Sequence, residues 1–493
     1  MIKQLFLLLF VTVLSFTTYA QAQVQYNPKA EVPMDEQIRH GVLENGLTYY
    51  ILTNKTPENR AEFFLVNNVG AMQETPNQNG FAHLVEHMCF NGTKNFEKKD
   101  IIHYLESIGM KFGPEINAYT VYDQTVYTLN KVPLETPENI DTSLMVLFDW
   151  ATNVSMETSE IDAERGVVRE ELRTRSSAMS RMRDQTNLVL FEGSKYAVHN
   201  IIGTVDVIDN SPADTLRAFY NDWYRPDLQS IIVVGDFDAD VMEAKVKAVF
   251  AKLPVAKNPK TREYHQIPDH KGIKVALVQD KESPYSIIQV VYKHDITKVK
   301  NQEYYRNQYL GQLYSIMINA RLDEVTQKVN PPFMQAASYK TDLVRTKDAY
   351  MSFAVASNTQ LKEALDELLT ENERVKKFGF LETELDRAKK EMLSMNEKSY
   401  NERHKKKSGS LANIIKGNYL TNDPIPSDDW DYAFVKEVVK TASLEEVSAL
   451  AKAWVKDDNM VIIVMAPDKE EVIMPTEAEV LAIAAGVHTK TIE

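Results

Sequence analysis

The sequence predicts an α+β protein made of two copies of one domain, because two landmarks repeat in the same order along its 493 residues. A pair of strand-like apolar segments begins at Gly46 and again at Gly272, 226 residues later. A tryptophan that precedes an apolar strand occurs at Trp223 and again at Trp454, 231 residues later. Long amphipathic helical patterns complete each copy, so each domain is expected to be a sheet packed by helices.

The composition is that of a large globular protein and argues against several other classes. Hydrophobic residues make up 44% and charged residues 26% of the chain, which excludes wholesale disorder and a polytopic membrane protein. The formal net charge is -14, and the only basic run covers residues 405–407. Nucleic acid is not expected as a partner, because its phosphates require clustered lysine and arginine.

Residues 1–22 have the pattern of a cleavable signal peptide. Lys3 precedes an apolar run at residues 5–16, and Ala20 and Ala22 form an A-x-A cleavage site. The run is too short to span a bilayer, which takes about 20 residues. We therefore expect export to the periplasm or the cell exterior and no membrane insertion of the mature chain. The lone Cys89 has no partner for an internal disulfide and is expected to pack in the core.

The remaining pattern divides the chain into two domains and a linker. The first domain is predicted at residues 30–252 and the second at residues 271–473. Residues 253–270 contain three prolines and scattered lysines, which is typical of a linker. In the second domain, residues 361–378 and 383–399 are predicted to form long amphipathic helices.

A further helix is predicted in the last segment, residues 474–493. Thr476 and Glu479 form a capping box, and residues 480–485 continue a short helix up to Gly486. Because the second domain ends before this segment, the helix is interpreted as a connector towards a further part of the protein. A C-terminal helix docked on the second domain is the alternative.

The chemistry is predicted in residues 80–92, which contain the pattern His-x-x-Glu-His. On a helix, His83, Glu86 and His87 share one arc of about 100°, and the apolar side chains lie on the opposite side. Two neutral imidazoles at i and i+4 can bind one metal ion, while the carboxylate between them acts on water. This inverzincin signature predicts a zinc site. A polar helix face with two surface histidines is the alternative.

A catalytic zinc needs a third protein ligand, and the helix predicted at residues 161–175 offers one. Glu164 and Glu171 lie on its apolar stripe, where an unpaired carboxylate is costly, whereas Glu170 faces outwards. Glu171 is therefore predicted as the ligand. Glu164, seven residues earlier, is predicted to orient a ligand histidine. A pair of interhelical salt bridges would explain the same pattern.

Taken together, these motifs resemble the pitrilysin/insulinase family of zinc peptidases. The resemblance is carried by Gly70-Ala-Met-Gln-Glu74, Gly80-Phe-Ala-His83-Leu-Val-Glu86-His87-Met, Gly92-Thr93, Asn117-Ala-Tyr-Thr120, Gln124-Thr-Val-Tyr127, Glu164-Arg-Gly-Val-Val-Arg-Glu-Glu171 and Trp223-Tyr-Arg-Pro226. It implies homologous α+β domains of the pitrilysin and mitochondrial-processing-peptidase type, which in pairs form one half of a clam-shell around a peptide.

The resemblance also implies a role for each site residue. Zinc would be bound by three protein ligands, His83, His87 and Glu171. Glu86 would be the general base. Asn117 and Ala118 would begin a strand that pairs with the backbone of the substrate. An ordinary interior strand is compatible with the same residues.

The second copy departs from the active pattern. Residues 309–314, which correspond to the histidine motif, contain neither His nor Glu, so no second zinc site is expected. The family also uses an Arg and a Tyr, seven positions apart in the facing half, to bind the substrate carbonyl. The corresponding positions of this chain hold Thr326 and Phe333. We therefore expect a homologous partner subunit or second half that carries the Arg/Tyr pair.

Two functions are compatible with the sequence. The favoured one is an exported zinc endopeptidase that hydrolyses peptides or unfolded protein segments in a closing chamber. The alternative is a catalytically idle scaffold or peptide-binding subunit of the same fold. The intact zinc and base residues favour the enzyme, since a scaffold has no need of them.

Overall fold

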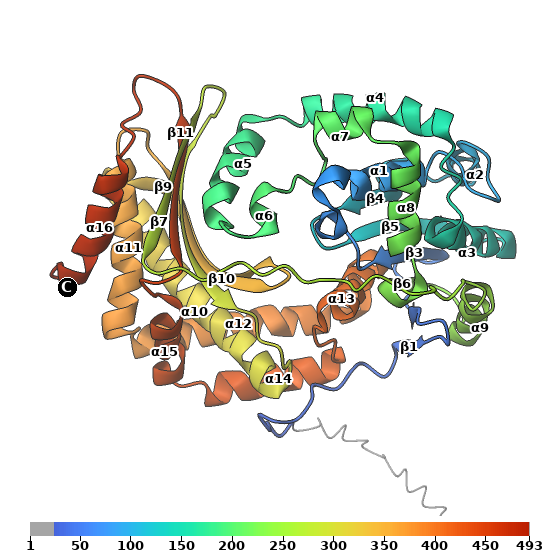
Figure 1. Ribbon diagram of the computed structural model, residues 1–493. Coiled ribbons are helices and arrows are strands. Elements are labelled where there is room, and N and C mark those ends of the chain that lie inside the picture. The colour runs from blue at the N-terminus through green and yellow to red at the C-terminus, as the bar shows by residue number, and fades with distance from the viewer. Residues whose placement is uncertain (1–23, 493) are drawn as a thin grey trace, which may run out of the picture.

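Two β-sheets, each covered by helices, form the protein in the computed structural model, which describes residues 24–492 (Figure 1). This architecture confirms the predicted α+β class. The predicted signal peptide at residues 1–22 lies outside the described residues. Among residues 24–492, no helix combines the length and apolar character needed to cross a bilayer.

The first sheet contains six strands in the order β1-β2-β6-β3-β5-β4. Their bounds are β1 (Arg39–Val42), β2 (Thr48–Thr53), β6 (Gln229–Gly235), β3 (Arg60–Asn67), β5 (Thr125–Pro133) and β4 (Ile116–Thr120). β2 and β6 are parallel, and the other neighbours are antiparallel. β4 lies at the edge of the sheet, with β5 as its one strand neighbour among the described residues.

The second sheet repeats this order without a counterpart of β1. Its strands run β7-β11-β8-β10-β9, with β7 and β11 parallel and the others antiparallel. Their bounds are β7 (Ile273–Asp280), β11 (Met460–Pro467), β8 (Ser286–Asp295), β10 (Lys347–Ala356) and β9 (Phe333–Val344). The same order and strand directions in both sheets give the sequence repeat a structural counterpart. β9 is the edge strand that corresponds to β4.

Helices cover both sheets. Those of the first half of the chain are α1 (Phe81–Met88), α2 (Asp100–Ser107), α3 (Pro137–Thr152), α4 (Thr158–Thr174), α5 (Ala178–Leu190), α6 (Lys195–Val198), α7 (Val205–Asn210), α8 (Ala213–Trp223) and α9 (Ala239–Phe250). Those of the second half are α10 (Gln302–Thr326), α11 (Leu361–Phe378), α12 (Glu382–Asn401), α13 (Ser408–Thr421), α14 (Asp428–Thr441), α15 (Leu444–Trp454) and α16 (Glu477–Thr489). The two long helices predicted in the second domain are α11 and α12.

Each sheet is also covered by a helix from the other half of the chain. Met182 and Leu190 of α5 lie in one apolar cluster with Val278 of the second sheet. In the same way, Ile415 of α13 packs with Phe64 of the first sheet. α13 begins 230 residues after α5, which is close to the spacing of the sequence repeat, so α5 and α13 are equivalent helices of the two halves. Residues 253–270, predicted as a linker, lie between α9 and β7 along the chain, and the helices that cover the two sheets interlock the two halves.

The C-terminal helix α16 packs on the second domain. Val480, Ala484 and Val487 are buried in the core of that domain, and the helix contacts α11 and β7. The helix was predicted to end before Gly486, but it continues to Thr489. Because Val487 extends the buried stripe, its packing outweighs the roughly 1 kcal/mol preference of glycine against helix. Whether α16 also connects to a further part of the protein stays a prediction.

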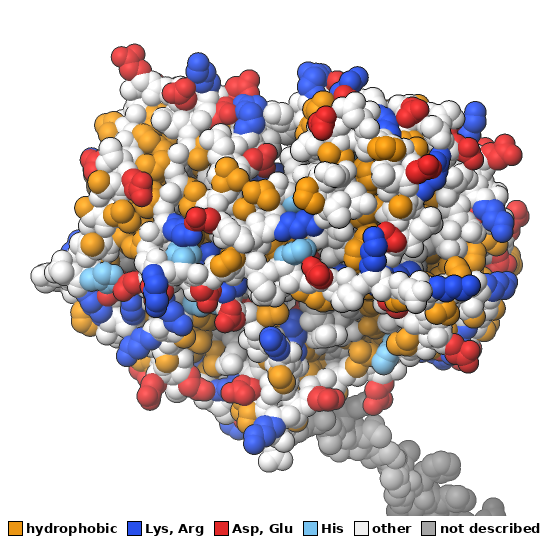
Figure 2. All heavy atoms as spheres, viewed as in Figure 1, with side chains coloured by type: hydrophobic (Ala, Val, Ile, Leu, Met, Phe, Trp, Pro, Cys, Tyr) orange, Lys and Arg blue, Asp and Glu red, His pale blue; other side chains and the backbone are white. Residues whose placement is uncertain are grey.

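Acidic and basic side chains are interspersed on the face of the protein shown in Figure 2. Apolar side chains lie singly or in small groups between them. This face therefore has no broad basic area of the kind that binds phosphate backbones.

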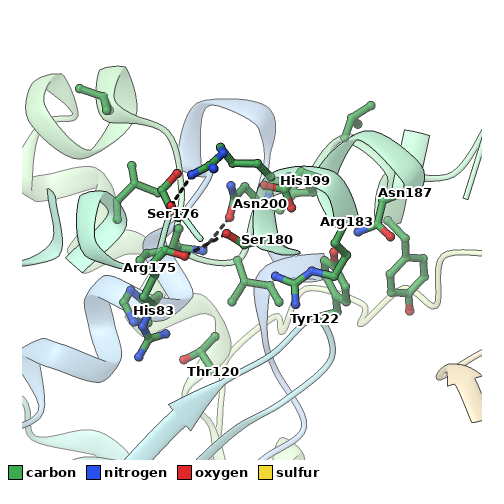
Figure 3. Close-up of a pocket in the computed structure, with 18 of the residues that line it drawn as sticks. His83, Thr120, Tyr122, Arg175, Ser176, Ser180, Arg183, Asn187, His199 and Asn200 are labelled. Atoms are coloured by element: carbon green, nitrogen blue, oxygen red, sulfur yellow. Dashed lines mark hydrogen bonds between the residues drawn. The ribbon is translucent and has the colours of Figure 1, made fainter. Parts of the chain in front are cut away.

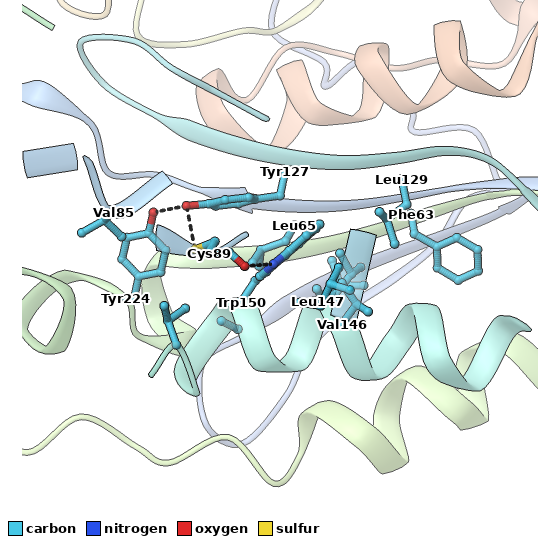
Figure 4. Close-up of a cluster of buried hydrophobic side chains, with 14 of the residues drawn as sticks. Phe63, Leu65, Val85, Cys89, Tyr127, Leu129, Val146, Leu147, Trp150 and Tyr224 are labelled. Carbon is cyan, nitrogen blue, oxygen red and sulfur yellow. Dashed lines mark hydrogen bonds between the residues drawn. The ribbon is translucent and has the colours of Figure 1, made fainter. Parts of the chain in front are cut away.

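The core of the first domain supports the end of α1 (Figure 4). Trp150 of α3 is fully buried, and its indole N–H donates a 2.8 Å hydrogen bond to the carbonyl of Cys89, the residue that caps α1. Cys89 packs in this core as predicted, with its sulfur 3.2 Å from the hydroxyl of Tyr127. The Tyr127 hydroxyl is in turn 2.7 Å from that of Tyr224.

Trp150→Ala should lower the free energy of unfolding by about 3–5 kcal/mol, because it removes a large buried ring and leaves a cavity. The Cys89 carbonyl would also lose its hydrogen bond. Urea unfolding followed by circular dichroism measures the effect. Met145→Ala, on the same helix but 38% exposed, is the control and should change the value by less than about 0.5 kcal/mol. Equal stabilities of the two variants would contradict this view of the core.

Candidate metal centre

The His-x-x-Glu-His pattern lies on α1, whose apolar side packs in the first core. Val85 and Met88 are fully buried. The helix begins after Gly80, which has a φ of 102°, in the left-handed region. A Cβ atom on Gly80 would lie 2.6 Å from the Cα atom of Gly203, so both the backbone conformation and the close approach require glycine. α1 is therefore fixed at both ends.

Contact between α1 and α4 brings the three predicted ligands together. Nε2 of His87 lies 3.1 Å from Oε2 of Glu171, and Nε2 of His83 lies 3.7 Å from Oε1 of the same carboxylate. One ligand atom from each residue lies within 4.8 Å of the others. Within residues 24–492, this is the one group of three His, Cys, Asp or Glu side chains with such spacing.

Glu164, which the sequence predicted as an orienting residue, contacts the other side of the His87 ring. Its Oε1 lies 2.7 Å from Nδ1 of His87, and its Oε2 accepts a 2.5 Å hydrogen bond from Asn91. When the neutral ring carries its proton on Nδ1, towards Glu164, the lone pair of Nε2 lies on the side of Glu171. Burial opposes the charged form of His87, but the hydrogen bonds to Glu164 and Glu171 outweigh it and raise its pKa to about 9. A metal ion must therefore displace a proton from this ring.

The donor set fits a zinc ion. Two imidazole nitrogens and one carboxylate are ligand types of catalytic zinc sites. Burial, together with the neighbouring His87, lowers the pKa of His83 to about 4, so this imidazole is neutral, as a metal ligand must be. Nδ1 of His83 is buried and has no hydrogen-bond partner among the described residues. The described residues thus leave one ring nitrogen of His83 without a hydrogen bond.

Glu86 lies beside the ligands and is 8% exposed. The hydroxyl of Thr120 donates a 2.6 Å hydrogen bond to its Oε2. Burial raises the pKa of Glu86 to about 7, although the hydrogen bond from Thr120 lowers it in part. A carboxyl group with this pKa can accept and return a proton near neutral pH.

A cavity of about 1390 Å³ opens in front of these residues (Figure 3). His83 and Glu86 form part of its wall, and residues of β4 and α5 form other parts. Asn117 and Ala118 lie on β4, the edge strand. Ala118 lines the cavity, and its backbone N–H donates a 2.8 Å hydrogen bond to Oδ1 of Asn117. The two residues predicted to bind substrate thus lie at a strand edge close to the candidate ligands.

Two further residues at the site received no role from the sequence. Thr120, which orients Glu86, comes from a separate strand, so only the tertiary contact reveals it. Arg175 lies one helical turn after Glu171, and its guanidinium is 2.6 Å from Oε1 of that carboxylate. The i,i+4 spacing of an acid and an arginine on one helix was a signal for this contact.

Comparison with known proteins identifies the family. Residues 49–194 match the insulinase family (Peptidase family M16), and residues 212–392 match the Peptidase M16 inactive domain. The chain belongs to peptidase family M16. The match of the second half to an inactive domain agrees with the absence of His and Glu from residues 309–314.

Curated M16 relatives cover most of the chain. A Haemophilus influenzae protein named "Probable zinc protease PqqL" is 32% identical over 400 residues, which are 81% of this chain and 42% of the relative. An Escherichia coli protein of the same name is 28% identical over 426 residues, which are 86% of this chain and 45% of the relative. The chain thus spans less than half the length of these relatives. Their names and the M16 family imply zinc as the cofactor.

Solved M16 structures share the fold. The crystal structure of the first half of the periplasmic protease PqqL from Escherichia coli matches with a TM-score of 0.87 and 26% identity, covering 94% of this chain and 99% of that one. The crystal structure of pitrilysin matches with a TM-score of 0.68 and 14% identity, covering 94% of this chain and 50% of that one. The second likeness concerns the fold alone.

Proposed function

We propose that the chain is the metal-bearing part of an exported zinc endopeptidase that hydrolyses peptides or unfolded protein segments in a closing chamber. One observation carries the proposal: two imidazoles and the Glu171 carboxylate converge next to the buried Glu86, and His83 and Glu86 line a large cavity. The names of the M16 relatives support it. A catalytically idle scaffold would not need this arrangement.

In this proposal, His83, His87 and Glu171 hold the zinc ion. Zinc bound there supplies a Lewis acid that polarises a carbonyl group and lowers the pKa of water. Glu164 keeps the ring of His87 in the orientation that directs Nε2 towards Glu171.

Glu86 would move the proton. It takes a proton from the attacking water and passes it to the nitrogen of the leaving amine. The hydrogen bond from Thr120 fixes Oε2, and Oε1 has no hydrogen-bond partner among the described residues, so this oxygen is available for the proton. Burial raises the pKa of Glu86 in the metal-free protein, which favours uptake of a proton by this carboxylate.

The substrate would bind as an added strand along β4. Residues 118–120 of β4 line the cavity, and Thr120 contacts Glu86, so this edge strand borders the candidate metal ligands. Main-chain hydrogen bonds to a strand edge accept many sequences. On binding, the N–H of Ala118 would exchange its bond to Asn117 for one to the peptide backbone.

A second half is proposed to complete the site. The hydroxyl of Thr326, at the end of α10, donates to the carbonyl of Asp323, and Phe333, at the start of β9, is fully buried. Neither side chain can donate a hydrogen bond to a substrate carbonyl in the cavity. A homologous partner subunit or second half with the Arg/Tyr pair would supply these donors. The length of the M16 relatives supports this part of the proposal.

Export to the periplasm or the cell exterior is proposed from the signal-peptide pattern in residues 1–22. The related Escherichia coli structure is described as that of a periplasmic protease, which supports the same compartment.

Metal analysis combined with a peptide assay tests the proposal. The purified protein should hold about one zinc ion per chain. His83→Ala and His87→Ala should each remove most of the zinc and, with it, peptide hydrolysis. His103→Ala, a histidine on α2 whose side chain is 70% exposed, should change neither. Full zinc occupancy in both site variants would refute the ligand assignment, and hydrolysis that survives zinc removal would refute the function.

A further inference from the structure

We propose that Glu74 is a positioning residue for α1, the helix that carries both histidine ligands, and that Lys195 and His199 hold Glu74 in place. The inference rests on the proposed zinc site, but it concerns side chains that the proposed mechanism does not use. Glu74 ends one of the segments that resemble the M16 family, and no role for it could be predicted from the sequence.

The carboxylate of Glu74 caps the start of α1. Its Oε2 accepts a 2.9 Å hydrogen bond from the N–H of Gly80, and its Oε1 accepts one of 2.7 Å from the N–H of Ala82. Gly80, at the N-cap position, has no side chain that could do this. The helix dipole, which is positive at this end, and these hydrogen bonds favour the charged form of Glu74, whereas burial opposes it and raises its pKa. The capped N–H of Ala82 immediately precedes His83.

Lys195 and His199, which we call the α6 clamp, fix Glu74 from the opposite side. Nε2 of His199 forms a hydrogen bond with Oε2 of Glu74, and the two side chains are almost completely buried. Nζ of Lys195 donates to the carbonyl of Met72 at 2.7 Å and also to the carbonyl of Glu74. Both the side chain and the backbone of Glu74 are therefore held.

The α6 clamp also connects α1 to the second domain. The helix before it, α5, packs on the second sheet through Met182 and Leu190. Gly203, four residues after His199, is the residue whose Cα atom approaches Gly80. The start of α1 is thus fixed by a segment that is itself supported by the other half of the chain.

Loss of this support should be measurable as a loss of zinc affinity. α1 has only eight residues, so a shift of its first turn moves His83 relative to Glu171 on α4. Residues that orient metal ligands typically change metal affinity by about 10–100-fold when they are replaced. Glu74 acts through the helix backbone, and the lower end of this range is expected.

The test compares zinc affinity, by competition with a chelator, and the visible spectrum of the cobalt-substituted protein. Glu74→Leu should weaken zinc binding by about tenfold or more and alter the cobalt spectrum. His199→Leu should weaken binding in the same direction. His199→Gln, which keeps a donor for Glu74, should recover most of the affinity. Glu62→Leu is the control, because Glu62 is a buried acid on β3 outside the cavity wall and should leave both readouts unchanged.

These readouts separate a positioning role from general stability and from catalysis. If Glu74→Leu and His199→Leu are folded by circular dichroism and bind zinc as the parent does, the proposal is wrong. If Glu74→Leu does not fold, the two His199 variants test the proposal instead. Equal zinc affinities of His199→Leu and His199→Gln would then overturn the proposal. Zinc binding does not depend on hydrolysis, so failure of the peptide assay in the parent protein would count against the proposed function alone.

Discussion

Glu86→Gln should reduce peptide hydrolysis by about 10²-fold or more while zinc stays bound. Glutamine keeps the size of the side chain and can still accept the hydrogen bond from Thr120, but it cannot take a proton. Glu86 contributes no ligand atom to the group formed by the two histidines and Glu171, so metal content should not change. The measurement is the steady-state rate on an unstructured peptide, with zinc determined on the same sample.

Glu106→Gln is the matched control for this variant. Glu106 is exposed on α2 and lies outside the cavity wall, so its replacement should change the rate by less than about twofold. Hydrolysis by Glu86→Gln at the parent rate, in the assembly that proves active, would show that another group accepts the proton.

The isolated chain should hydrolyse peptides about 10²-fold to 10³-fold more slowly than a complete M16 enzyme, because removal of a single oxyanion donor already costs this much. Thr326 and Phe333 cannot replace the missing Arg and Tyr. A homodimer would not help, since both copies carry the same two residues. Zinc binding and peptide binding should persist in the isolated chain, because their residues lie within it.

The comparison needs the purified chain, free of other polypeptides, and full-length Escherichia coli PqqL on the same peptide. Addition of candidate partner halves should then raise the rate of the chain, and replacement of the Arg or the Tyr of an effective partner should abolish the gain. Turnover by the isolated chain at the rate of the full-length enzyme would refute the need for a second half. The zinc assignment would be unaffected.

The sequence was sufficient for those features that depend on local periodicity. Helical spacing predicted that the two histidines share one face of α1 and that Glu164 and Glu171 share one face of α4. The structure brings His83, His87 and Glu171 together. Glu164 was predicted from the same stripe, and it contacts His87. The repeat spacing also predicted two similar sheets, since strands of the same kind recur in the same order.

Features that depend on packing between distant segments could not be predicted. Nothing in the pattern of α5 or α13 indicates that each covers the sheet of the other half. The contacts of Thr120 with Glu86 and of His199 with Glu74 join residues 34 and 125 positions apart, so no local pattern marks them. The continuation of α16 beyond Gly486 could not be predicted either, because burial of Val487 outweighs the tendency of glycine to end a helix.

Anomalous scattering can show whether His83, His87 and Glu171 bind zinc. Diffraction from crystals of the zinc-loaded protein, recorded on both sides of the zinc absorption edge, would locate the ion. One strong difference peak is expected between the imidazoles of His83 and His87 and the carboxylate of Glu171, and this peak should be lost in His87→Ala. A peak at other residues, with none between these three side chains, would contradict the zinc assignment.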